Sequence, residues 1–261
     1  MRLPLFQVDA FTNKVFAGNP AAVCPLESWL PGATLQAIAA ANNLAETAFF
    51  VPAGDGFELR WFTPVSEVDL CGHATLATAF VLCSILEPAR ERVVFATRTA
   101  GPLAVIREGE RYTLDFPARP PKPCLPPAGL FEALGGPEPR ATLMARDLVV
   151  VYNSEEVVRN LKPDMTKLAA LDVFAVCVTA KSDTVDFVSR FFAPRQGIPE
   201  DPVTGSAHCT LVPYWAERLD RSVLEARQVS GRGGALSCRL SGDRVFITGS
   251  AALYLEGMID V

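Results

Sequence analysis

Short runs in which apolar and polar residues alternate dominate the chain and predict β-strands. They cover residues 47–51, 57–62, 93–96, 103–108, 111–116, 147–152, 173–179, 185–192, 235–240 and 244–250. Three longer and mainly apolar stretches predict helices, at residues 35–41, 74–86 and 207–219. The pattern therefore predicts a mixed α/β (α+β) chain with many short strands and few helices.

One motif occurs twice along the chain. Arg60-Trp61-Phe62-Thr63-Pro64 and Arg190-Phe191-Phe192-Ala193-Pro194 share the order Arg, aromatic, Phe, small, Pro at an offset of 130 residues. Pro31 and Pro163, each before a helical stretch, lie 132 residues apart. Two pairs at nearly one offset predict a duplicated architecture, in which each half is a sheet around one central helix. Generic α+β patterning is the alternative.

Six prolines between residues 117 and 127 interrupt the pattern near the midpoint of the chain. Proline lacks the backbone N–H and restricts φ, so this density excludes regular structure and predicts a linker. We therefore place the two halves at residues 1–118 and 119–249.

Gly72 and Gly205 each precede a run of small residues where the two central helices are predicted to begin. The N–H groups of a first helical turn lack intrahelical acceptors, and glycine lets a ligand approach them closely. If the halves pack about a pseudo-twofold axis, both helix starts face one cleft that suits a small carboxylate. The alternative is that each glycine only makes a tight turn.

Four further polar residues lie near these glycines. The two histidines of the chain, His73 and His208, are each within three residues of one. Histidine exchanges protons near neutral pH, so His73 is a candidate catalytic residue, whereas we assign His208 to helix packing. Asp201 can orient a substrate or cap its own loop, and Ser206 can bind substrate or serve as the helix N-cap.

Glu46 lies between a predicted helix and an apolar strand, beside Ala45, Ala48 and two phenylalanines. Partial desolvation there would suit a general acid or base, and a solvated loop glutamate is the alternative. The second half has no glutamate at the matching position, so a symmetric frame would carry an asymmetric acid/base group.

Composition narrows the possible functions. Hydrophobic residues make up 49% of the chain and charged residues 20%, and the net charge of −5 has no basic cluster to bind nucleic acid. We expect no membrane span or signal peptide, because no apolar run approaches about 18 residues and the N-terminal segment soon turns polar. Seven scattered cysteines without a CxxC pair predict reduced thiols, a cytoplasmic protein and no metal site.

Five segments together resemble the phenazine-biosynthesis-like (PhzF) isomerase family, which is related to diaminopimelate epimerase. They are residues 6–11, 16–23, 43–49, 67–75 and 201–207, in the order in which the family has them. The resemblance implies the diaminopimelate-epimerase-like fold, with two homologous halves, each a curled and mostly antiparallel sheet around a central helix. It also implies that a C-terminal segment, about residues 250–261, completes the first half, and that the protein is a homodimer.

The resemblance also implies a chemistry. In the phenazine enzyme, the glutamate that matches Glu46 shifts a proton along a dihydro-hydroxyanthranilate ring without a cofactor. Positions matching His73, Asp201 and Ser206 line that site. The helix-start backbone that matches Gly72, Ala74 and Gly205 holds the substrate carboxylate.

Two other functions stay open at this stage. Epimerase relatives use two cysteines, and Cys71 stands where they have the first, but no cysteine stands at the second position. An amino-acid racemase or epimerase would therefore need Cys71 with a different second base. The other alternative is a non-catalytic protein that binds a small molecule on the same scaffold.

Overall fold

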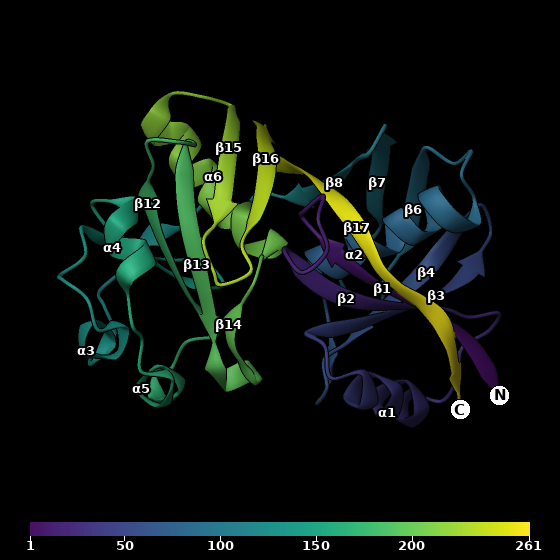
Figure 1. Ribbon diagram of the computed structural model, residues 1–261. Helices are drawn as coiled ribbons and strands as arrows, with labels where there is room; N and C mark the ends of the chain where they lie inside the picture. The colour runs from purple at the N-terminus through teal and green to yellow at the C-terminus, as the bar shows by residue number, and fades with distance from the viewer. The chain divides into compact units, whose positions relative to one another are not determined.

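The computed structural model describes residues 1–261. They form two compact units, one of Met1–Phe116 with Ile247–Val261 and the other of Pro117–Phe246 (Figure 1). No helix is both long and apolar enough to span a bilayer.

The first unit is a sheet around one buried helix. Its strands are β1 (Arg2–Ala10), β2 (Asn19–Pro25), β3 (Glu46–Ala53), β4 (Gly56–Phe62), β5 (Glu67–Val68), β6 (Arg92–Ala96), β7 (Leu103–Glu108), β8 (Arg111–Pro117) and the distal part of β17 (Arg244–Asp260). Its helices are α1 (Gly32–Asn42), α2 (Gly72–Val81) and the π-helix η1 (Leu82–Leu86). β2–β3 and β4–β6 pair in parallel, because α1 and α2 provide the crossover connections.

The second unit repeats this plan. Its strands are β9 (Lys122–Pro123), β10 (Ala141–Met144), β11 (Leu148–Val151), β12 (Val176–Lys181), β13 (Phe187–Ala193), β14 (Ile198–Asp201), β15 (Val223–Gln228) and β16 (Gly234–Ser241). Its helices are α3 (Leu130–Leu134), α4 (Glu155–Asn160), α5 (Met165–Ala170), the 3₁₀ helix η2 (Pro194–Gln196) and α6 (Gly205–Leu219). Its parallel pairs, β11–β12 and β13–β15, again flank helical crossovers, which confirms the predicted duplicated fold.

The repeated arginine motif makes the same contact in each unit. Arg60 binds both carboxylate oxygens of Glu67 at 2.7 and 2.8 Å, and Arg190 binds both of Glu200 at 2.8 and 2.9 Å. Each guanidinium also lies over the phenylalanine two residues further along, at 5.0 and 4.9 Å from the ring centre. In each unit, this ion pair joins two neighbouring strands: the strand that carries the arginine and the short strand that leads to the central helix.

The central helix α2 is buried along nearly its whole length. Nine of its ten residues are buried, and it packs against β1, β2 and β3. The hydroxyls of Thr75 and Thr78 donate to the carbonyls four residues earlier, at 2.5 and 2.7 Å, so these polar side chains need no water. Apart from His73 and Phe80, the remaining residues are small or aliphatic, which suits close packing inside a curled sheet.

The proline-rich linker is more ordered than we predicted. Lys122 and Pro123 form the short strand β9, which pairs with β10, so the expectation that no regular structure occurs there is wrong. Before it, the Arg119 N–H donates to the Cys209 carbonyl of α6 at 2.8 Å. Pro213, inside α6, cannot donate to that carbonyl, so the linker fills the gap that this proline leaves.

Two predicted elements differ from the structure in extent. The helix predicted at 74–86 is an α-helix only to Val81, and a π-helical turn follows it because Glu87 N–H reaches back to Leu82. The strand predicted at 244–250 runs on to Asp260, because β1 pairs along it from Ala10↔Ala251 to Arg2↔Asp260 (Figure 1). No local pattern announces a partner strand from the other end of the chain.

Candidate active site

Three elements of the first unit begin at one place. Glu46 is the first residue of β3 and pairs in parallel with Ala21 of β2. Asn19 is the first residue of β2, and Cys71 is the N-cap of α2. Since α2 packs on both strands, the three starts bring side chains from distant parts of the sequence together.

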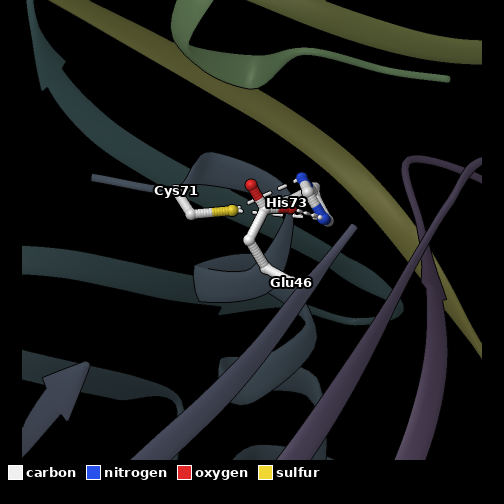
Figure 2. Close-up of side chains that lie close together, drawn as sticks. All are labelled: Glu46, Cys71 and His73. Atoms are coloured by element: carbon white, nitrogen blue, oxygen red, sulfur yellow. Dashed lines mark hydrogen bonds and ion pairs between the residues drawn. The ribbon is translucent and has the colours of Figure 1, made fainter. Parts of the chain in front are cut away.

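Figure 2 shows Glu46, Cys71 and His73 pointing toward one another. His73 Nε2 lies 3.1 Å from Glu46 Oε2, and His73 Nδ1 lies 3.5 Å from Cys71 Sγ. Nδ1 also lies 3.1 Å from Asn19 Nδ2. All four residues are buried, so Glu46 is not the solvated loop residue that was its alternative assignment.

One oxygen of Glu46 is poorly satisfied in this cluster. Oε2 is buried, yet it has no well-aligned hydrogen-bond donor, although His73 Nε2 is only 3.1 Å away. Catalytic hydrogen bonds are often misaligned in a free enzyme and tighten when substrate binds. A buried carboxylate oxygen in this state is suited to accept a proton.

Burial and charge both shift the pKa values of Cys71 and His73, the neighbours of Glu46. Burial, with a contribution from the Glu46 carboxylate, raises the pKa of Cys71 to about 11, so this thiol is uncharged at neutral pH. Burial lowers the pKa of His73, but the charges of Cys71 and Glu46 and its hydrogen bonds with them raise this pKa well above its ordinary value.

The same three side chains are possible metal ligands. A carboxylate oxygen, a ring nitrogen and a sulfur lie within 4.8 Å of one another. This donor set suits Zn²⁺ when the thiol is deprotonated. Any activity assay therefore needs a chelator control.

The start of α2 carries the predicted carboxylate-binding backbone. Gly72 and His73 are its first two residues, Ala74 follows, and no side chain caps this end of the helix. The first-turn N–H groups therefore lack an intrahelical acceptor. Substrate binding by Gly72 and Ala74 stays a prediction.

The predicted residues of the second half gather at the start of α6. Asp201 ends β14, and its Oδ2 accepts a 2.5 Å hydrogen bond from the Thr204 hydroxyl. Thr204 is the N-cap, so the assignment of Ser206 as N-cap is wrong: Gly205 is already helical. The Ser206 hydroxyl instead accepts from Arg146 Nη2 at 3.3 Å. That these residues share one cleft with Glu46 and His73 stays a prediction.

Gln228 is a residue that the sequence analysis missed. It is buried at the end of β15, its Nε2 donates to the Asp201 carbonyl at 2.6 Å, and its Oε1 accepts from the Thr204 N–H at 2.8 Å. The side chain thereby holds the loop that leads into α6. No local signal marks it, because an isolated glutamine in a strand is usually a surface residue.

His208 is fully buried in the core of the second unit. Its ring packs against Phe187, and Nδ1 donates to the Thr204 carbonyl at 2.9 Å, whereas Nε2 has no partner. Burial lowers the pKa of His208 to about 4. The ring is therefore neutral, with its single proton on Nδ1.

This burial predicts an acid-sensitive stability. Between pH 6.5 and 4 the unfolded chain protonates His208 and the folded chain does not, so acidification favours unfolding, by about 3 kcal/mol at pH 4. We expect His208→Asn, whose amide can still donate to Thr204, to lack this loss. Urea unfolding from pH 7.5 to 4 measures it, and parallel curves for the two proteins would contradict the assignment.

Comparison with known proteins adds independent findings. The family model described as "Phenazine biosynthesis-like protein" matches residues 8–121 and 135–257. A protein of Pseudomonas aeruginosa named "uncharacterized isomerase" is 53% identical over 259 residues, which are 99% of each chain.

Solved structures agree with this match. The crystal structure of a PhzF family protein from Enterococcus faecalis superposes with a TM-score of 0.96, at 49% identity and over 100% of both chains. A hydroxyproline epimerase from Agrobacterium vitis, 13% identical, superposes with a TM-score of 0.62 over 99% of this chain and 92% of its own. At that identity the second likeness shows a shared fold.

Proposed function

Because this chain belongs to the phenazine biosynthesis-like family and is an isomerase, we propose that it moves a proton within a small carboxylate-bearing substrate, with Glu46 as general acid and base. The observation that carries the proposal is the buried Oε2 of Glu46, which lacks an aligned donor beside His73. No bound cofactor is required, since the proton alone changes place.

The reaction has two proton transfers. The Glu46 carboxylate takes a proton from a substrate carbon next to an electron-withdrawing group, and the electron pair left behind spreads toward that group. The N–H groups at the start of α2 stabilise this enolate-like charge. Glu46 then returns the proton to another carbon of the same conjugated system, so atoms and charge balance.

The geometry favours proton transfer on one face of the substrate. Glu46, His73 and Cys71 all lie in the first unit and within one cluster. Racemases that invert a stereocentre need acid/base groups on opposite faces. A single carboxylate that removes and returns the proton therefore fits an isomerisation better than an inversion.

The second unit supplies substrate binding in this proposal. Its free helix-start amides at Gly205, with Ser206 and Asp201, would hold a carboxylate and a neighbouring polar group in a cleft shared with Glu46. The fixed loop before α6, which Gln228 holds, suits such a rigid contact. The seven unpaired cysteines support a reducing, cytoplasmic setting, and a homodimer stays a prediction.

The test is solvent hydrogen exchange into defined substrates. We would incubate the protein in D₂O with EDTA and dihydro-hydroxyanthranilate, or with a panel of small unsaturated and amino carboxylates, and follow mass and double-bond position. Deuterium uptake with a moved double bond supports the proposal. Uptake with inversion at a stereocentre supports the racemase, and no uptake with any compound that binds contradicts both.

The racemase remains a second candidate because of one observation. Cys71 Sγ lies 3.5 Å from His73 Nδ1, which is the arrangement of a thiol beside a base. Burial opposes this role, since it holds the Cys71 pKa near 11. A racemase would also need its second base elsewhere, because Cys209 of the second unit is buried inside α6.

Cys71→Ala separates these two functions. If the thiol is a packing residue, we expect kcat to change by less than about threefold and the iodoacetamide sensitivity of the enzyme to be low. A loss of about 10²-fold or more, the range of a lost acid/base group, would favour the racemase instead. Cys83→Ala, at another buried thiol of the same unit, is the matched control.

A further inference from the structure

Thr204 occupies the N-cap position of α6, yet its side chain does not cap the helix. In the same unit, Ser154 and Asp164 cap the short helices α4 and α5 through their side-chain oxygens. Threonine is a preferred N-cap residue, and a cap of this kind contributes about 1 kcal/mol. The Thr204 hydroxyl is therefore held away from the position that an N-cap side chain usually takes.

The Thr204 hydroxyl instead lies between Asp201 and Gln228. Its oxygen is 2.5 Å from Asp201 Oδ2 and 3.2 Å from Gln228 Nε2. Asp201, Thr204 and Gln228 are all buried, with 7%, 7% and 1% of their surfaces exposed. With so little access to solvent, these polar side chains depend on protein partners for their hydrogen bonds.

The backbone fixes the orientation of the Gln228 amide. The Thr204 N–H can only donate, so the amide atom that meets it at 2.8 Å is Oε1. The Asp201 carbonyl can only accept, so the amide atom that meets it at 2.6 Å is Nε2. The second proton of Nε2 is donated to the Thr204 hydroxyl oxygen. Because that oxygen accepts from Gln228, the hydroxyl's own proton is donated to Asp201 Oδ2.

We propose that Gln228 is a positioning residue that turns the Thr204 hydroxyl onto Asp201. The hydrogen bonds run from Gln228 Nε2 through the Thr204 hydroxyl to Asp201 Oδ2. The proposal rests on the proposed function, in which Asp201 and the start of α6 bind the substrate.

This chain of hydrogen bonds acts on both parts of the substrate site in the second unit. Because Oδ2 of Asp201 is held in place, the carboxylate meets a substrate in one orientation. Because the Thr204 hydroxyl is directed at Asp201, no side chain covers the first-turn N–H groups of α6, as none covers those of α2. Gln228 thereby favours substrate binding over helix capping.

Side-chain amide spectra test the direction of these hydrogen bonds without any turnover. The amide of Gln228 gives one pair of ¹H–¹⁵N signals, which resonance assignment identifies. Thr204→Val keeps the shape of the side chain and removes the hydroxyl. In this variant we expect one of the two Gln228 amide protons to lose its acceptor and move upfield, while the proton bound to the Asp201 carbonyl stays. An unchanged pair of signals in the folded variant would overturn the proposal.

Thr204→Val also tests the effect on catalysis. Gln228 can still hold the backbone of the loop in this variant, whereas Asp201 loses its donor. We expect kcat/KM for dihydro-hydroxyanthranilate to fall by about 10- to 100-fold, because a misplacement of about 1 Å in a site can cost that much. A merely structural role would lower the fraction of folded protein and leave the kcat and KM of the folded enzyme unchanged, and that result would overturn the positioning role.

Two further threonine variants complete this comparison. Thr204→Ser keeps the hydroxyl and should recover most of the activity that Thr204→Val loses. Thr142→Val is the matched control, because it removes a hydroxyl of the same unit that donates to the Cys124 carbonyl at 2.7 Å. It should retain wild-type turnover. Equal losses in Thr204→Ser and Thr204→Val would contradict the role of the hydroxyl.

A double-mutant cycle shows whether Gln228 acts through Thr204. If it does, Thr204→Val should lower kcat/KM much less in a Gln228→Leu background than in the wild-type protein. Additive losses would mean that the two residues act independently, and would contradict the proposal. If Gln228→Leu does not fold, the amide spectra and Thr204→Ser still decide.

The outcomes separate this proposal from the proposed function. A shifted Gln228 signal in Thr204→Val, together with full activity of a Glu46→Gln variant, would leave the hydrogen-bond chain intact and reject the acid/base role of Glu46. An unchanged signal together with an inactive Glu46→Gln variant would do the reverse.

Discussion

Glu46→Gln is expected to lower kcat by about 10²- to 10⁴-fold, the usual contribution of a positioned general acid or base. The amide has the shape of the carboxylate and can keep the contact with His73, but it cannot take a proton from carbon. We therefore expect substrate affinity and the free energy of unfolding to change little. Deuterium uptake from D₂O into substrate, compared at saturation, measures the loss.

Glu27→Gln is the matched control, because Glu27 is an exposed glutamate of the same unit. It should retain wild-type turnover. Full activity of the Glu46→Gln protein would show that another group moves the proton. If every ligand-dependent function survived as well, the non-catalytic binding protein would be the remaining explanation.

Gly18→Ala is expected to lower the free energy of unfolding by about 2–5 kcal/mol. Gly18 has φ +65°, a left-handed conformation that costs other residues about 1–2 kcal/mol. A β-carbon there would lie 2.2 Å from the Ala10 carbonyl oxygen, and relieving such overpacking costs about 1–3 kcal/mol more. Because Asn19 follows directly, the shift would also disturb its contact with His73.

Two other glycines separate these contributions. Gly54 has φ +57° and open space around it, so Gly54→Ala should show the conformational cost alone. Gly32 has neither the unusual φ nor a close neighbour, so Gly32→Ala should change stability by less than about 0.5 kcal/mol. Urea unfolding of the three variants measures the series, and equal losses for Gly18→Ala and Gly54→Ala would contradict the predicted clash.

Local sequence patterns were sufficient for much of the fold. The strand of residues 103–108 and the helix ending at Leu219 follow from runs whose period matches their structure. The repeat could be recognised in the sequence because Arg60 and Arg190 belong to matching motifs. In the structure, each of these arginines binds a carboxylate at the same place in its half. Each of these features is determined by residues that are close in sequence, or by a motif that recurs in both halves.

The sequence by itself also determined the family and marked Glu46, His73, Asp201 and Ser206 as candidates, through segments whose order and spacing are specific. Only the tertiary structure decided what these residues contact. Asn19 reaches His73 across 54 residues, and Gln228 reaches Thr204 across 24. Such contacts arise where strands and a helix start converge, and side-chain hydrogen bonds over these separations leave no periodic trace in the sequence.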